Sequence, residues 1–196
     1  RGEELDVFAS RAFALADHQM AHVYTKSPED LASARELLQG LPGVEGLWSG
    51  SQRAEIGLDH ERAGDLVLRA QPGAWFTYYY WLDERARPDF ATTVDIHSKP
   101  GYDPCELFVD PKLAAPTLRV VRRVLQKKLG MRYLMDVIPT DASLVGGSHG
   151  RGAQDPLDGP VFLSSAPFQA GDLPADGVLP MTSVRDRVLQ LLSSPN

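Results

Sequence analysis

Two short segments far apart in the chain constrain this sequence more than any other feature. Asp17 and His18 end an apolar run, and His149 lies in the Gly-Ser-His-Gly segment at residues 147–150. His149 follows His18 by 131 residues. Carboxylate and imidazole groups bind divalent metals, so a fold that joins the two segments would form a metal centre. The alternative is that Asp17 caps a turn while the histidines fill ordinary hydrogen-bonded positions.

Residues 22–82 have the pattern of a self-contained α+β unit. Ser27 is a favourable N-cap residue, and Pro28 suits the first position of a helix in which apolar residues recur at helical spacing up to Leu41. Strands are predicted at residues 7–18, 22–25, 44–48, 65–70 and 75–81, with one helical turn at 52–56. This order predicts an antiparallel sheet with helices on one face.

Beyond residue 82 the predicted elements are sparser. The sequence predicts an amphipathic helix at 116–129, a terminal helix at 183–192, and strands at 133–138 and 161–164. Residues 83–115 are rich in Pro, Asp and Gly and are predicted to form a loop. The basic residues between positions 119 and 128 are predicted to form a solvated face of the first of these helices.

Two further groups of side chains are candidates for contacts with a substrate. His97, Lys99 and Tyr102 lie in the long loop and could bind a phosphate or a leaving group; alternatively, His97 ties the loop to the core by hydrogen bonds. The aromatic residues between positions 75 and 81 could stack on a nucleotide base; alternatively, they occupy the two faces of a strand. The sequence alone leaves both alternatives open.

Composition limits the partners and the compartment. The net charge of −6 argues against a nucleic acid polymer or an anionic membrane, because such partners need clustered basic groups. No apolar run approaches the length of a membrane span. The single cysteine, Cys105, excludes an intrachain disulfide framework and favours a reducing compartment. We therefore predict a cytoplasmic location and a buried or half-buried thiol.

The order of features after Val145 is the most specific part of the sequence. The Gly-Ser-His-Gly segment is followed by a loop rich in Asp, Pro and Gly, by a strand at residues 161–168, and by Met-Thr-Ser-Val at 181–184, which opens a helix ending in Leu-Leu. This order resembles the C-terminal end of the alkaline phosphatase superfamily, in particular its type I phosphodiesterase/nucleotide pyrophosphatase branch. The resemblance covers the whole chain in layout, and its specific motifs surround His149 and the Asp17-His18 pair.

The resemblance implies a site for two divalent metal ions, usually zinc. Asp17 and His18 would be ligands of one ion, and His149 would be a ligand of its neighbour. One departure is that Gln19 replaces the glycine that normally follows the Asp-His pair. The usual pair could therefore lie upstream, with Asp17 and His18 as a supporting element. Because the chain begins at Arg1 without an initiator methionine, we expect it to be a fragment.

The resemblance also implies how the chain divides. Residues 1–21 and 83–196 would be the remnant of an α/β core of the alkaline phosphatase type, and residues 22–82 would be an inserted α+β cap with an antiparallel sheet. The family's nucleophile, a Thr or Ser at a helix N-terminus, would precede this chain. The chain alone is therefore expected to be inactive.

Two functions of different classes follow from these observations. The first is the C-terminal part of a metal-dependent hydrolase that cleaves a small-molecule phosphate ester by two-metal phosphoryl transfer, together with the N-terminal part of the same protein. The second is a non-catalytic α+β recognition domain in which the histidine motifs are incidental. The fold class predicted in both cases is α+β.

Overall fold

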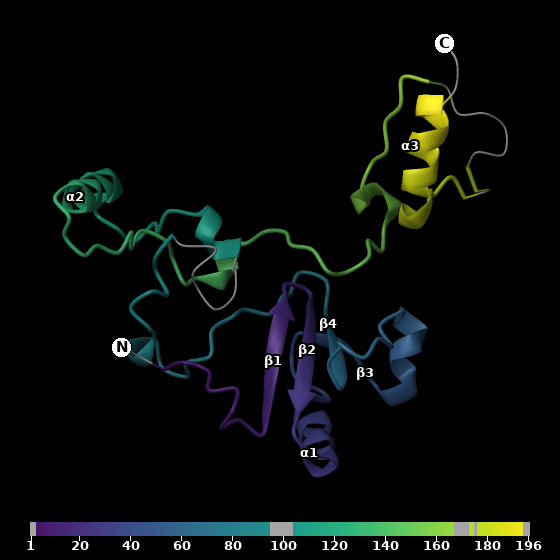
Figure 1. The fold of residues 1–196 in the computed structure, drawn as a ribbon, viewed down its shortest axis with the longest axis horizontal. Coiled ribbons are helices and arrows are strands. Elements are labelled where there is room, and N and C mark those ends of the chain that lie inside the picture. The colour runs from purple at the N-terminus through teal and green to yellow at the C-terminus, as the bar shows by residue number, and fades with distance from the viewer. Residues whose placement is uncertain (1–2, 95–103, 167–172, 175, 194–196) are drawn as a thin grey trace. The chain divides into compact units, whose positions relative to one another are not determined.

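The computed structural model describes residues 3–94, 104–166, 173–174 and 176–193. The chain forms two compact units, which comprise residues 1–151 and 152–196. The larger unit contains the sheet and the helices α1 (Pro28–Leu38) and α2 (Pro116–Lys128), while the smaller unit contains α3 (Val184–Ser193) (Figure 1). None of the described helices is both long and apolar enough to cross a membrane.

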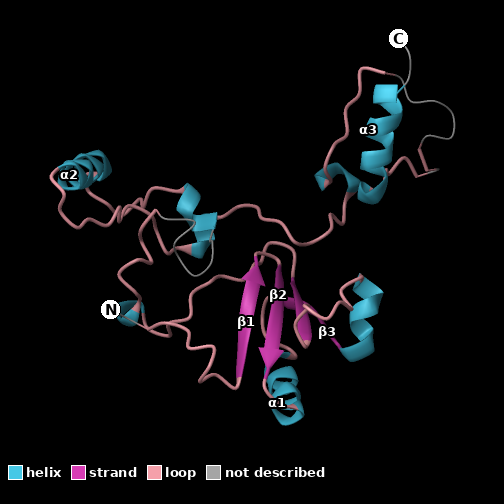
Figure 2. Cartoon of the chain, viewed as in Figure 1, coloured by secondary structure: helices cyan, strands magenta, loops and turns pink. Residues whose placement is uncertain are grey.

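The sheet of the larger unit is antiparallel throughout. Its strands are β1 (Ala12–Asp17), β2 (Met20–Thr25), β3 (Val44–Ser49) and β4 (Leu66–Ala70), in the spatial order β1-β2-β4-β3 (Figure 2). The predicted α+β class is confirmed, as are the strands predicted near residues 44–48 and 65–70. The β1–β2 hairpin spans the predicted boundary between residues 21 and 22, while the division into a core and an inserted cap stays a prediction.

The turn that joins β1 and β2 is very short. Asp17 pairs with Met20, so His18 and Gln19 form a two-residue turn. His18 has a φ of 54°, which places it in the left-handed region that favours glycine. Positive φ at the first turn position is the pattern of a type II′ turn, which fits the twist of the flanking strands. Backbone geometry therefore fixes His18 at the tip of the hairpin.

The core lies between one face of the sheet and α1. Ala21 and Val23 of β2 and Leu66 and Leu68 of β4 are buried there. The apolar side of α1 packs against them through Leu31, Ala34 and Leu38. The Oγ of Ser27 accepts a hydrogen bond from the amide of Asp30 at 3.1 Å, which confirms the predicted N-cap. This packing anchors the strands that carry the hairpin tip.

The prediction of a strand at residues 75–81 is wrong. This segment is linked to the β1–β2 hairpin by one backbone amide and two tyrosine hydroxyls. Phe76 N–H donates to the carbonyl of His18 at 2.7 Å, Tyr78 Oη donates to that of Ala16, and Tyr80 Oη donates to that of Ala14 at 3.2 Å. Because the tyrosine hydroxyls donate to the carbonyls of alternate β1 residues, the backbone of residues 75–81 does not pair with β1 as a further strand.

The remaining elements are short. The predicted helical turn at 52–56 is part of a 3₁₀ helix, but the strands predicted at 133–138 and 161–164 are absent from the described structure, where Asp136 forms only an isolated bridge with Thr93. The 3₁₀ helices are η1 (Gly50–Ile56), η2 (Glu84–Ala86), η3 (Pro104–Leu107), η4 (Ala142–Leu144), η5 (Pro156–Asp158) and η6 (Met181–Ser183). The terminal helix predicted at 183–192 is confirmed as α3.

Two smaller predictions are also confirmed. No residue of α2 is buried, and its basic residues lie on a solvated helix. Two of them are nevertheless paired, because Arg119 and Arg123 both contact the carboxylate of Asp136 at 3.1 and 2.8 Å. Cys105 is buried, and its Sγ lies 3.5 Å from the carbonyl oxygen of Asp141.

Candidate functional site

The structure brings the two distant segments together. His149 Nδ1 lies 3.8 Å from Asp17 Oδ1. The imidazole rings of His18 and His149 have their centroids 4.0 Å apart, with an angle of 33° between their planes. Side chains separated by 131 residues therefore share one location at the tip of the β1–β2 hairpin.

The backbone of the 147–151 loop is docked on the same hairpin tip. The amide of Gln19 donates to the carbonyl of His149 at 2.9 Å. Gly150 has a φ of 103°, and a Cβ at this position would stand 2.8 Å from the carbonyl oxygen of Asp17 and 3.1 Å from the amide nitrogen of Met20. Only a glycine allows this approach, so the last residue of the Gly-Ser-His-Gly motif has a structural role.

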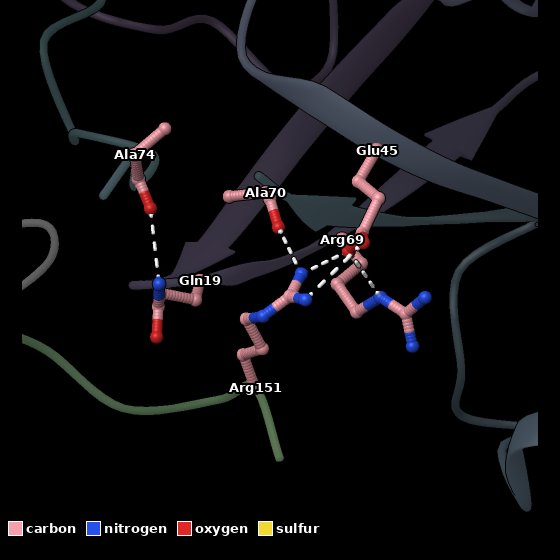
Figure 3. A network of polar contacts seen from close by, with 6 residues as sticks. All are labelled: Gln19, Glu45, Arg69, Ala70, Ala74 and Arg151. Carbon is pink, nitrogen blue, oxygen red and sulfur yellow. Dashed lines mark hydrogen bonds and ion pairs between the residues drawn. The ribbon is translucent and has the colours of Figure 1, made fainter. Parts of the chain in front are cut away.

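Arg151 was not among the residues that the sequence singled out, yet it is the most buried charge near the site, with 9% of its side chain exposed. Its guanidinium contacts both carboxylate oxygens of Glu45 and donates to the carbonyl of Ala70 at 3.0 Å (Figure 3). Arg69 Nε donates to the same Glu45 at 2.9 Å. We call these four residues the Arg151 network. The only signal in the sequence is an arginine directly after the glycine-rich motif.

Burial, together with the charge of Asp17, shifts the pKa of two side chains near the hairpin tip. Burial lowers the pKa of His22, and the Asp17 carboxylate opposes this effect. Burial raises the pKa of Tyr78, and Asp17 raises it further. Asp17 and His149 are themselves open to solvent, with 68% and 66% of their side chains exposed, whereas His18 is buried. The carboxylate and one imidazole are thus accessible to an ion or a substrate.

The geometry gives a partial donor set for a metal. Protein ligands lie about 2.0–2.2 Å from zinc, and paired ions in two-metal sites lie about 3.5–4 Å apart. The gap of 3.8 Å between Asp17 and His149 suits two donors that share an ion or that serve neighbouring ions. However, no group of three or more His, Cys, Asp or Glu side chains among the described residues is arranged to hold a metal ion. Further ligands would be needed to complete a centre.

The second predicted group of site residues cannot be compared with this geometry. His97, Lys99 and Tyr102 lie outside the described residues. The aromatic residues after β4 are described, and they do not occupy the two faces of a strand. Among them, Tyr79 and Trp81 stack on each other, with ring centroids 4.9 Å apart. Base stacking by this segment stays a prediction.

Comparison with known proteins identifies one family. Residues 3–103, just over half of the chain, match the family model described as type I phosphodiesterase / nucleotide pyrophosphatase. The matched region contains Asp17 and His18 and ends before His149. Neither a curated protein nor a solved structure matches the chain.

Proposed function

Because the chain belongs to the type I phosphodiesterase/nucleotide pyrophosphatase family, we propose that it is part of a metal-dependent hydrolase of phosphate esters. The family supports a phosphoester hydrolase kind of function, and the dependence on metal is the proposed refinement. The observation that carries the refinement is the meeting of Asp17 with His149 across 131 residues. Two solvent-accessible donors at one hairpin tip supply part of an ion-binding site, since zinc takes three or four protein ligands.

In this proposal each of the three residues has a distinct role. Asp17 and His18 bind one divalent ion, and His149 binds its neighbour; zinc is the ion we expect. When bound, such ions polarise the phosphorus ester and neutralise the charge that develops on its oxygens. The tight hairpin turn holds His18, and the docked loop holds His149 against Asp17. Both imidazoles must be neutral and the carboxylate ionised to act as ligands, so acid weakens the site.

Among the described residues the set of metal donors is incomplete. We propose that the remaining ligands and the nucleophile come from another part of the same protein. The substrate is proposed to be a small-molecule phosphate ester, whose phosphate would lie at the exposed side of Asp17 and His149. His97, Lys99 and Tyr102 remain the proposed contacts for its phosphate or its leaving group.

The test uses the full-length protein, its bound metal, and turnover of bis-p-nitrophenyl phosphate. We expect His149→Ala to lower both the zinc content and the turnover, the latter by at least about tenfold. His60→Ala is the matched control, because His60 lies in an exposed turn, where its Nδ1 accepts a hydrogen bond from the amide of Arg62. Unchanged metal content and turnover in His149→Ala would overturn the proposal and favour a non-catalytic recognition domain.

A further inference from the structure

Hydrogen bonds at the hairpin tip form a closed circuit that includes Arg151. Arg151 Nη1 donates to the carbonyl of Ala70 at 3.0 Å, and the amide of Ala70 donates to the carbonyl of Gln19 at 2.9 Å. The amide of Gln19 in turn donates to the carbonyl of His149 at 2.9 Å. Arg151 follows His149 by two residues, so the chain itself closes the circuit.

The circuit attaches the loop to the sheet at two points. One point is the hairpin turn, through Gln19, and the other is the end of β4, through Ala70. A single hydrogen bond would leave the loop free to rotate, whereas two attachments, one at the carbonyl of His149 and one at Arg151, fix the backbone of His149. Among the described residues, a Cβ at Gly146 or Gly147 would meet nothing within 4 Å, so these two positions lack close neighbours on that side.

Glu45 explains why the second attachment needs an arginine. Its carboxylate binds Arg151 and Arg69 together, so the guanidinium is held in place while it donates to Ala70 (Figure 3). A guanidinium presents several N–H donors in a rigid fork and can serve a carboxylate and a carbonyl at once. The lysine ammonium is a compact point charge on a flexible stem and is poorly suited to replace this fork.

We propose that Arg151 is a positioning residue, which fixes His149 beside Asp17 and His18 through the circuit of Ala70 and Gln19. The role rests on the proposed function in one respect only, namely that the fixed imidazole is a metal ligand. Arg151 itself touches neither the ion nor the substrate in this account. Its low exposure of 9%, next to a His149 side chain that is 66% exposed, fits a support under an accessible ligand.

The test is amide hydrogen exchange at Gln19, because this N–H points at the carbonyl of His149. In Arg151→Met we expect exchange at Gln19 to rise at least about tenfold while the amides of the β2–β4 ladder stay protected. In Arg151→Lys the exchange rate at Gln19 is expected to lie between the rates in Arg151→Met and in the unaltered chain, because lysine keeps the charge but lacks the forked guanidinium donors. Arg123→Met is the matched control, because Arg123 pairs with Asp136 away from the circuit.

The outcomes separate this inference from the proposed function. Unchanged exchange at Gln19 in Arg151→Met overturns the positioning role. Should Arg151→Met also lose protection in the ladder, the Lys variant decides: faster exchange at Gln19 with an intact ladder supports the role, and unchanged exchange contradicts it. A Zn²⁺ titration of the same proteins is expected to show about tenfold weaker binding in Arg151→Met. Absence of Zn²⁺ binding by the unaltered protein would count against the proposed function, whereas the exchange result would stand.

Discussion

Two clusters in this molecule place a pair of arginines around one carboxylate, and they differ in what they constrain. One is the Arg151 network around Glu45, and the other joins Arg119 and Arg123 to Asp136. In the first, Arg151 and its carboxylate are 106 residues apart; in the second the separations are 17 and 13 residues. The side chain of Arg151 is 9% exposed, whereas those of Arg119 and Arg123 are 43% and 22% exposed.

The difference shows that the same ion-pair chemistry can have local or global consequences. The Asp136 cluster fastens α2, which buries no residue, to the segment that follows it. The Arg151 network instead connects a distant loop to β3 and to β4, and β4 contributes Leu66 and Leu68 to the core. An exposed arginine paired with a nearby carboxylate, as Arg119 is with Asp136, contributes about 1 kcal/mol or less. Arg151 is buried and links residues that are far apart in the sequence, so its contacts affect which distant side chains lie together.

The largest effect on amide exchange at Gln19 is expected from Gly150→Ala, because this change directly disrupts the contact between the 147–151 loop and the hairpin tip. The new methyl group would lie 2.8 Å from the carbonyl oxygen of Asp17, at a φ of 103° that alanine rarely adopts. We expect exchange at the Gln19 amide to rise about thirtyfold or more. Gly147→Ala, where a Cβ meets nothing within 4 Å, is the control and is expected to have little effect. Equal behaviour of the two variants would show that the loop is not docked as described.

A smaller effect is expected when the carboxylate of each cluster is neutralised. Glu45→Gln keeps a side chain of similar shape but removes the charge that holds Arg151, so exchange at Gln19 should rise by about three- to tenfold. Asp136→Asn makes the same change in the other cluster and should leave Gln19 unaltered. If both variants changed the exchange rate at Gln19 by similar amounts, the two clusters would not differ in their range as described.

The smallest effect is expected from lowering the pH, which protonates Glu45 in the Arg151 network. The hydrogen bond from Arg151 holds the pKa of Glu45 below its ordinary value of 4.5. The stabilisation by ionised Glu45 is therefore complete above pH 4.5 and is lost as the pH falls through the lower folded pKa. Protection of Gln19, corrected for intrinsic exchange rates, should decline only below pH 4.5. If the protection of Gln19 began to decline at neutral pH, an ionisable group other than Glu45 would control the docking of the 147–151 loop.

The sequence predicted those parts of the fold that depend on local patterns. The N-cap at Ser27, α1 and the strands near residues 44–49 and 66–70 follow from spacing and from residue type. The strand at 75–81 was mispredicted because alternating aromatic residues imitate a strand. In the structure the hydroxyls of Tyr78 and Tyr80 reach the β1 carbonyls instead.

The site depends on contacts that a local pattern does not encode. The family resemblance pointed to Asp17, His18 and His149, but not to the support beneath them. Arg151 meets Glu45 and Ala70, which are 106 and 81 residues away. The left-handed backbone of His18 is also unexpected, because a strand and turn pattern would place glycine there.

The central claim is that Asp17 and His149 belong to one ion-binding site, and a Zn²⁺ titration by calorimetry tests it most directly. The full-length protein and its Asp17→Asn, His149→Ala and double variants would be compared at neutral pH. We predict that Asp17→Asn and His149→Ala each weaken Zn²⁺ binding by at least about tenfold, because each removes a donor from the proposed two-ion centre, and that the double variant is weakened at least as much. Unchanged affinity in either single variant would contradict the claim.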